Sequence, residues 1–211
     1  MHDVIEDIYT ETEGLDVDTL ANLGPLAPLA GVWAGRGLDV NPFGDGERRQ
    51  AFDERIELEP IDPQSNGPQF FYGLRYHTRV VKPGEVETYH DQVGYWLWEP
   101  ATHLVLLSLT IPRGQVVLAK GEAAADARSF EVVAERGSTE NGICSTAFLE
   151  RAFRTERFRM EVKVAADGSW SYFEDTVLGV IGRSEVFHHT DENRLRRVAA
   201  PRPNPLMRGE G

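Results

Sequence analysis

Arg157-Phe158-Arg159-Met160-Glu161-Val162-Lys163-Val164 is the stretch that decides the fold, because charged and apolar residues alternate along it one by one. Successive side chains of an extended chain point to opposite faces, so the stretch predicts a strand with one apolar face and one charged face. Ala166-Asp167-Gly168-Ser169 follows, and an Asp-Gly pair is a strong hairpin signal. Residues 170–178 then supply the return strand of a predicted antiparallel hairpin.

Similar alternating runs cover the chain on both sides of this hairpin, and clusters of Gly, Pro, Asp and Asn separate them. We expect further strands at residues 32–40, 51–59, 69–81, 86–98, 103–111, 115–120, 129–135, 143–153 and 194–198. Closing such a locally connected meander removes its exposed strand edges. The sequence therefore predicts an all-β fold, a single antiparallel up-and-down β-barrel of roughly ten strands.

The two ends of the chain differ from the barrel region. Asp18 can cap a short helix that Gly24-Pro25 ends, and the apolar residues 26–30 follow it. We expect this segment to plug one open end of the barrel. The expected organisation is a flexible acidic arm over residues 1–15, a ligand-binding β-barrel over residues 16–199 and a disordered tail over residues 200–211.

The composition argues against several partners. The formal net charge is −12 and the pI is about 5.0, which disfavours contact with the phosphates of nucleic acid. The acidic N-terminus does not resemble a secretory signal, and no run approaches the ~20 apolar residues that span a bilayer. The single cysteine, Cys144, cannot form an internal disulfide. We therefore expect a cytoplasmic protein without a nucleic-acid or membrane partner, whose cysteine is a small strand or loop residue.

A barrel of this size has room inside for side chains and one small molecule. The predicted strands carry many large aromatic residues: Phe70, Phe71, Tyr72, Tyr76, Tyr89, Tyr95, Trp96, Trp98, Trp170 and Tyr172. Alternation sends about half of them inward, where most fill the core and where they also suit a flat, apolar guest. The aromatic content would also allow a homodimer.

Patterns for catalysis and metal binding are sparse. The sequence has no nucleophile elbow, phosphate loop or dinucleotide fingerprint, and its histidines lack zinc-site spacing. Gly35 and Gly37 lie two apart in a predicted strand, so they leave one face open to close approach. His188 and His189 are adjacent, so an extended backbone would turn one of them toward the cavity. The alternative is two exposed histidines before a polar turn at residues 190–193.

Leu29-Ala30-Gly31-Val32-Trp33-Ala34-Gly35-Arg36-Gly37 resembles the opening motif G-x-W-x-G-x-G of the nitrobindin-like, heme-binding β-barrels. That family shares a calycin-type architecture with fatty-acid-binding proteins. The resemblance continues at Gly73-Leu74-Arg75-Tyr76, at His90-Asp91-Gln92-Val93-Gly94-Tyr95, and at residues 110–117 and 120–121. It covers roughly residues 26–198.

The resemblance implies a ten-stranded barrel with a heme b pocket at one end and a histidine near the start of the last strand as iron ligand. That position falls on His189, with His188 as the adjacent alternative. The motif residues implied to contact the cofactor are Trp33, Gly35, Gly37, Tyr76, His90 and Tyr95. Family members are credited with binding nitric oxide and with isomerising peroxynitrite to nitrate.

This chain departs from the family pattern at three places. The family continues the ligand histidine as His-Leu-x-Ala-x-Leu, whereas His189 leads into Thr190-Asp191-Glu192-Asn193. Residues 60–68 and 137–151 are added segments that could cover or reshape the pocket.

Three hypotheses therefore stay open. The first is a heme b protein that uses His189 and interacts with nitric oxide or related nitrogen oxides. The second is a metal-free carrier of a fatty-acid-like or other hydrophobic small molecule. The third is an enzyme, either a heme-dependent peroxynitrite isomerase or one that uses an acid such as Glu174 or Asp175.

Overall fold

The hairpin predicted around Asp167-Gly168 is formed by β10 (Phe153–Val164) and β11 (Trp170–Val180) in the computed structural model, which describes residues 7–209. The two strands are antiparallel, with Val164 opposite Trp170. Gly168 has a φ of 80°, a backbone conformation that glycine adopts readily. The apolar side chains of β10 face the interior, so the alternation predicted there is confirmed.

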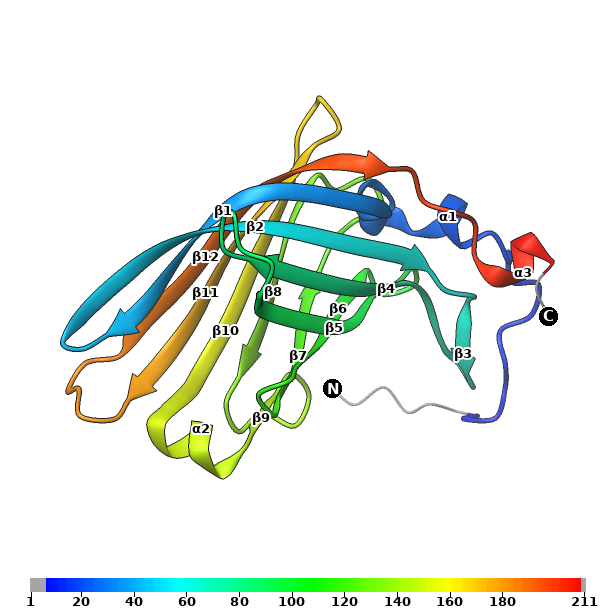
Figure 1. Cartoon of the computed structure of the whole chain (residues 1–211). Coiled ribbons are helices and arrows are strands. Elements are labelled where there is room, and N and C mark those ends of the chain that lie inside the picture. The colour runs from blue at the N-terminus through cyan, green and yellow to red at the C-terminus, as the bar shows by residue number, and fades with distance from the viewer. Residues whose placement is uncertain (1–6, 210–211) are drawn as a thin grey trace.

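Ten long strands close into a ring (Figure 1). Besides β10 and β11 these are β1 (Gly31–Phe43), β2 (Gly46–Pro60), β4 (Gln69–Val81), β5 (Thr88–Glu99), β6 (Leu104–Ile111), β7 (Gln115–Glu122), β8 (Ser129–Glu135) and β12 (Phe187–Ala199). All neighbours are antiparallel; β1 pairs with β12, and β2 pairs with β4. Two three-residue strands, β3 (Gln64–Asn66) and β9 (Ile143–Ser145), add to β4 and β7. The predicted antiparallel barrel is confirmed.

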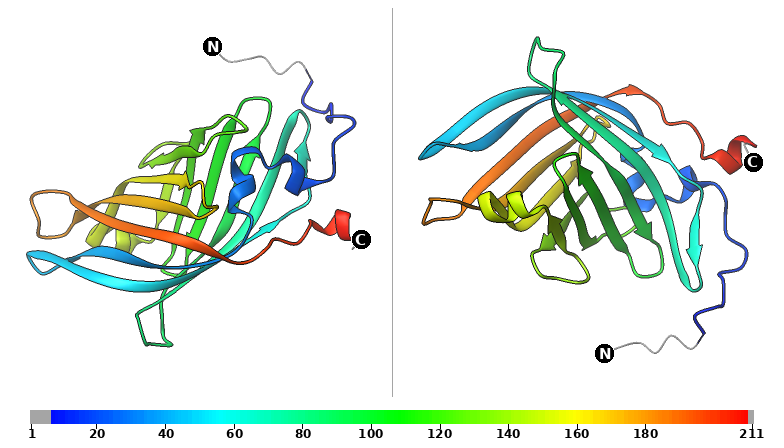
Figure 2. Two further views of the ribbon diagram at one scale, coloured as in Figure 1. Left: turned by 90° about the horizontal axis from the view of Figure 1, so that it is seen from above. Right: turned by 60° about the horizontal axis from the view of Figure 1, so that its bottom comes forward.

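The predicted plug lies across one end of the barrel (Figure 2). It consists of α1 (Thr19–Asn22) and the 3₁₀-helix η1 (Gly24–Leu29), and the Asp18 side chain accepts a hydrogen bond from the Ala21 amide at 3.2 Å. Leu23, Leu26 and Leu29 are fully buried. The Trp33 indole donates to the Leu29 carbonyl at 2.7 Å, which joins the plug to β1. This end of the barrel is therefore filled by side chains.

The tail differs from the disorder expected of it. Asn204 is fully buried; it donates to the Asp62 carboxylate at 2.7 Å and accepts from the Thr19 amide at 3.2 Å. A short helix, α3 (Pro205–Arg208), follows. These hydrogen bonds link the segment to the plug and to the loop after β2, which a composition-based expectation cannot detect. Of the expected arm, residues 1–6 lie outside the described residues.

Two further segments differ from the predicted strands. Residues 143–153 were expected to be one strand, but they form β9, the helix α2 (Ala147–Ala152) and the start of β10. The last strand begins at Phe187 instead of residue 194, so the polar residues 190–193 extend the sheet rather than form a turn. Backbone pairing with β1 and β11 holds these polar residues in the strand. Among residues 7–209, no helix has the length and apolar character needed to cross a membrane.

Candidate functional site

The half of the barrel away from the plug contains two cavities that share part of their lining. The deep cavity has a volume of about 110 Å³ and the outer cavity, toward α2, about 440 Å³. The larger volume falls within the roughly 300–1,000 Å³ typical of ligand sites. Residues common to both linings are Asn41, Tyr89, His90, Gln92, Arg113, Glu174 and His189. These residues therefore mark the junction between an inner and an outer compartment.

The outer cavity is mainly apolar. Its apolar side chains come from β1, β6, β7, β10, β11 and α2: Pro42, Phe43, Leu109, Ile111, Val117, Phe148, Leu149, Phe153, Phe158 and Leu178. Two arginines also line it, Arg48 on β2 and Arg113 in the turn between β6 and β7. The Arg48 guanidinium lies 3.7 Å from the centroid of the Phe43 ring, and Arg113 donates to the Tyr89 carbonyl at 3.1 Å. The cavity thus combines an apolar wall with two fixed positive charges.

The two adjacent histidines of β12 point to opposite sides of the barrel wall. His189 lines both cavities, whereas the side chain of His188 is 59% exposed and pairs with Asp175 at 2.9 Å. Adjacent residues of a strand alternate between faces, which explains the separation. The structure therefore places His188, the alternative ligand, outside the cavity.

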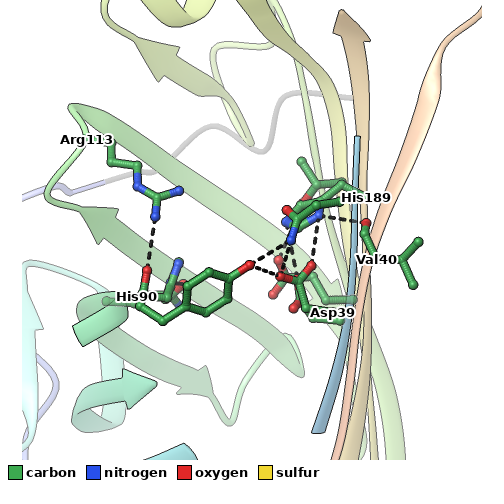
Figure 3. A network of polar contacts seen from close by, with 11 residues as sticks. Asp39, Val40, His90, Arg113 and His189 are labelled. Carbon is green, nitrogen blue, oxygen red and sulfur yellow. Dashed lines mark hydrogen bonds and ion pairs between the residues drawn. The ribbon is translucent and has the colours of Figure 1, made fainter. Parts of the chain in front are cut away.

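His189 is oriented by the neighbouring strand. Its Nδ1 lies 3.1 Å from the Val40 carbonyl oxygen, which can only accept a hydrogen bond (Figure 3). Nδ1 must therefore carry the hydrogen, and in the neutral ring this leaves Nε2 as the nitrogen with a free electron pair. Nε2 lies 3.4 Å from Oδ2 of Asp191. Nε2 is therefore the ring nitrogen that could coordinate a metal ion.

Three acidic residues form a row beside His189. Asp191 on β12 lies directly opposite Asp39 on β1 and Glu174 on β11, and all three side chains line the deep cavity. Burial raises the pKa of Asp191 to about 6, and the Asp39 carboxylate adds to this rise. Burial also raises the pKa of Glu174 well above its usual range, with Asp191 and Glu54 contributing. Like charges directly opposite in a sheet are destabilising, so this row has a cost in stability.

The deepest polar group is Glu54 on β2, which is 5% exposed. Its Oε2 accepts hydrogen bonds from the Tyr172 hydroxyl at 2.9 Å and from the Asn193 amide at 2.7 Å. Burial raises its pKa to about 7. The carboxyl group of Glu54 therefore titrates near neutral pH.

Two other residues expected at the cofactor line the deep cavity. The Gln92 amide donates to the Tyr76 hydroxyl at 2.7 Å, and its oxygen lies 3.3 Å from Nε2 of His90. Burial lowers the pKa of His90, so this ring is neutral at physiological pH. The structure therefore places Tyr76, His90 and His189 around the deep cavity.

The remaining expected residues do not line either cavity. Trp33 is fully buried near the plug and packs edge-on against Trp170, with ring centroids 6.0 Å apart. Tyr95 is 43% exposed on the outer face. Both positions follow from strand alternation and from the plug, which fills the end of the barrel where Trp33 lies.

Gly35 and Gly37 make room for protein side chains instead of a ligand. A Cβ at Gly35 would lie 2.5 Å from the Asn193 amide oxygen, and one at Gly37 would lie 2.3 Å from the Phe52 ring. The open strip that the sequence predicts is therefore present, but Asn193 and Phe52 occupy it.

The sequence interpretation missed Asp39, Glu54 and Asp191. Glu54 and Asp191 are inward residues whose outward neighbours are also polar, so no alternation of apolar and polar residues reveals them. Asp39 lies inward between the outward residues Leu38 and Val40, which is the reverse of the usual alternation. The one available signal was the polar insert after His189, which contains Asp191.

Comparison with known proteins relates this chain to a protein family and to solved structures. A family model described as "THAP4-like, heme-binding beta-barrel domain" matches residues 22–197. The crystal structure of Rv2717c from M. tuberculosis is similar, with a TM-score of 0.60 and 19% sequence identity, over 86% of this chain and 99% of that chain. At that identity the likeness concerns the fold. No curated protein sequence matches this chain.

Proposed function

This chain belongs to the THAP4-like, heme-binding β-barrel family, and from that premise we propose that it binds heme b in the outer cavity through His189 and there interacts with nitric oxide or a related nitrogen oxide. The observation that carries the proposal is the hydrogen bond between Nδ1 of His189 and the Val40 carbonyl. Histidines that bind a metal usually donate their other ring N–H to a carbonyl or carboxylate in this way.

The cavity beside His189 also suits a heme. Its apolar wall includes Phe153, Phe158 and Leu178, which can pack against the faces of a porphyrin. Arg48 and Arg113 line the same cavity, and a guanidinium is a strong partner for a carboxylate such as a heme propionate. An apolar wall with two arginines is therefore the environment that an amphipathic, doubly negative cofactor needs.

A bound heme would supply an iron that can bind a small nitrogen oxide. The groups of this chain that could orient such a ligand are His90, Gln92 and Tyr76, which line the deep cavity. The one N–H of the neutral His90 ring is directed to the Gln92 oxygen, which leaves Nδ1 as an acceptor. The Tyr76 hydroxyl accepts from Gln92, so its own hydrogen is free to be donated to a ligand. Asp191 is the residue that competes for His189, since its carboxylate lies 3.4 Å from Nε2. Its side chain has to turn away from Nε2 when iron binds there.

The direct test is a hemin titration of the purified protein followed by absorbance. We expect a saturable Soret shift with one hemin per chain in the wild type and in His188→Ala, and its loss in His189→Ala. His188→Ala is the matched control because that ring lies on the outer face of the same strand. An unchanged Soret spectrum in His189→Ala would refute the assignment of the ligand.

The nitrogen oxide part of the proposal needs separate measurements. Nitric oxide added to the reduced, hemin-loaded protein should shift the Soret band. Peroxynitrite decay faster than with an equal amount of free hemin would extend the proposal to isomerase activity, and an equal rate would limit it to binding.

A metal-free carrier of a hydrophobic molecule is the second candidate, because the same apolar wall and arginines suit a fatty carboxylate. A wild type that shows no saturable Soret shift but retains lipid through purification would favour it.

The cytoplasmic location and the homodimer stay predictions.

A further inference from the structure

We propose that Asp39, His189 and Asp191 form a binding site for one divalent transition-metal ion, such as Zn²⁺ or Mn²⁺, in the heme-free protein. The site shares His189 with the proposed heme site, so the two ligands should exclude one another. The proposal goes beyond heme binding, because the donor atoms and their surroundings support it independently.

The donor atoms are already close together. One nitrogen of His189 and one carboxylate oxygen from each aspartate lie within 4.8 Å of one another. Nε2, the nitrogen with the free electron pair, lies 3.4 Å from Oδ2 of Asp191, and Oδ1 of Asp39 lies 3.4 Å from Nδ1 on the other side of the same ring. Small side-chain rotations would bring three such atoms to the roughly 2.0–2.2 Å bonds that Zn²⁺ forms with nitrogen and oxygen.

The backbone fixes this arrangement. Asp39 and Asp191 are directly opposite across the β1–β12 pair, and His189 precedes Asp191 by two residues, so it lies on the same face. The three ligands therefore come from two hydrogen-bonded strands in the barrel wall. Little backbone ordering is needed when an ion binds.

One carboxylate oxygen has no donor to satisfy it. Asp39 is 3% exposed, and its Oδ1 receives no hydrogen bond from the residues that the structure describes. Its Oδ2 accepts from the Tyr89 hydroxyl at 2.6 Å and from the Asn41 amide. The hydrogen on Nδ1 of His189 is directed to the Val40 carbonyl. A buried, unsatisfied acceptor of this kind is costly, and a bound cation would remove the cost.

The negative charge around the site also favours a bound cation. Glu174 continues the acidic row on the far side of Asp191, and with Glu54 this makes four carboxyl groups that line one cavity. Arg113 shares the deep cavity, but its guanidinium hydrogen bond goes to a backbone carbonyl. A divalent ion would turn the repulsion within the row into attraction.

The donor set selects the class of ion. Imidazole with two carboxylates suits Zn²⁺, Fe²⁺ and Mn²⁺, whereas Ca²⁺ and Mg²⁺ prefer oxygen ligands alone. We therefore expect Zn²⁺ and Mn²⁺ to bind more tightly than Mg²⁺.

The test uses the full-length, heme-free protein after removal of metals with a chelator. Zn²⁺ is titrated calorimetrically, and Mn²⁺ is followed through the loss of the free-ion electron paramagnetic resonance signal. We expect one ion per chain. Asp39→Asn and Asp191→Asn should each weaken binding by more than the about 10–100-fold that loss of a residue supporting a ligand costs. The control is Asp175→Asn, which removes a carboxylate paired with the outward His188 and should leave binding unchanged.

Hemin binding separates this proposal from the preceding one. Asp39→Asn and Asp191→Asn should still give the Soret shift, which also shows that they fold, and hemin should displace Zn²⁺ from the wild type. Unchanged Zn²⁺ affinity in both variants, or no saturable binding of either ion to the wild type, would overturn the metal site and leave heme binding intact. Zn²⁺ binding without a Soret shift would retain the metal site and remove heme.

Discussion

Replacement of Glu54 by glutamine should stabilise the heme-free protein at alkaline pH and have little effect at acid pH. Both hydrogen bonds to this carboxyl end on the same atom, Oε2, from Tyr172 and Asn193. A glutamine amide oxygen in the Oε2 position can accept both, and its NH₂ group then replaces Oε1. The substitution therefore removes the buried charge and keeps the contacts.

The magnitude follows from the pKa of Glu54, which rises from 4.5 to about 7 on folding because of burial. At about 1.4 kcal/mol per pKa unit, this difference corresponds to about 3 kcal/mol. Below pH 4.5 the carboxyl is protonated in both states and costs nothing. As the pH rises toward 7, the unfolded chain loses this proton first, so the free energy of unfolding falls by that amount. The glutamine variant avoids this loss.

Urea denaturation of both proteins at several pH values between 4 and 8 measures the effect. The difference in unfolding free energy should grow from near zero at pH 4 to about 3 kcal/mol at pH 8, or about 6–12 °C in Tm for a chain of this size. Glu57→Gln is the control for charge removal on the same strand, because Glu57 pairs with Arg55 on the outer face. A difference between wild type and Glu54→Gln that does not change with pH would refute the reasoning.

Three further predictions concern the plug, the barrel wall and the outer cavity. Leu26→Ala should lower the unfolding free energy by about 2–5 kcal/mol, because Leu26 is fully buried in the plug; urea denaturation measures the loss, and an unchanged midpoint would show that the plug adds no stability. Gly94→Ala should destabilise the barrel by at least about 1–3 kcal/mol, since a Cβ there would lie 1.9 Å from the Ser108 carbonyl oxygen. Gly46→Ala is its control, with the nearest atom 3.9 Å away, and an equal loss in both variants would contradict the steric explanation. Arg113→Gln should speed the transfer of hemin to an acceptor protein, because it removes a positive charge from the outer cavity; an unchanged rate would show that this arginine does not hold a propionate.

The strand content of this chain could be predicted from the sequence because it depends on local alternation. The run from Arg157 to Val164 and the Asp-Gly turn specify a hairpin by themselves, and the other alternating runs follow the same rule. Local rules failed where contacts distant in the chain decide the structure. Asn204 is ordered by partners near residues 19 and 62, and residues 190–193 form a strand because β1 and β11 lie on either side of them.

The candidate site likewise has some features that the local sequence specifies and others that depend on contacts between distant parts of the chain. The sequence alone predicted that an extended backbone would turn one of His188 and His189 inward, because adjacent residues of a strand point to opposite faces, and it left open that both are exposed before a turn. The register of β12 against β1 and β11 decided which one, since a slip by a single residue would exchange their faces. The same register brings Asp39, Glu174 and Asp191 into one row, although up to 152 positions separate them in the chain. Only the closed barrel could reveal that cluster, because cross-strand neighbours are set by pairing and not by distance along the sequence.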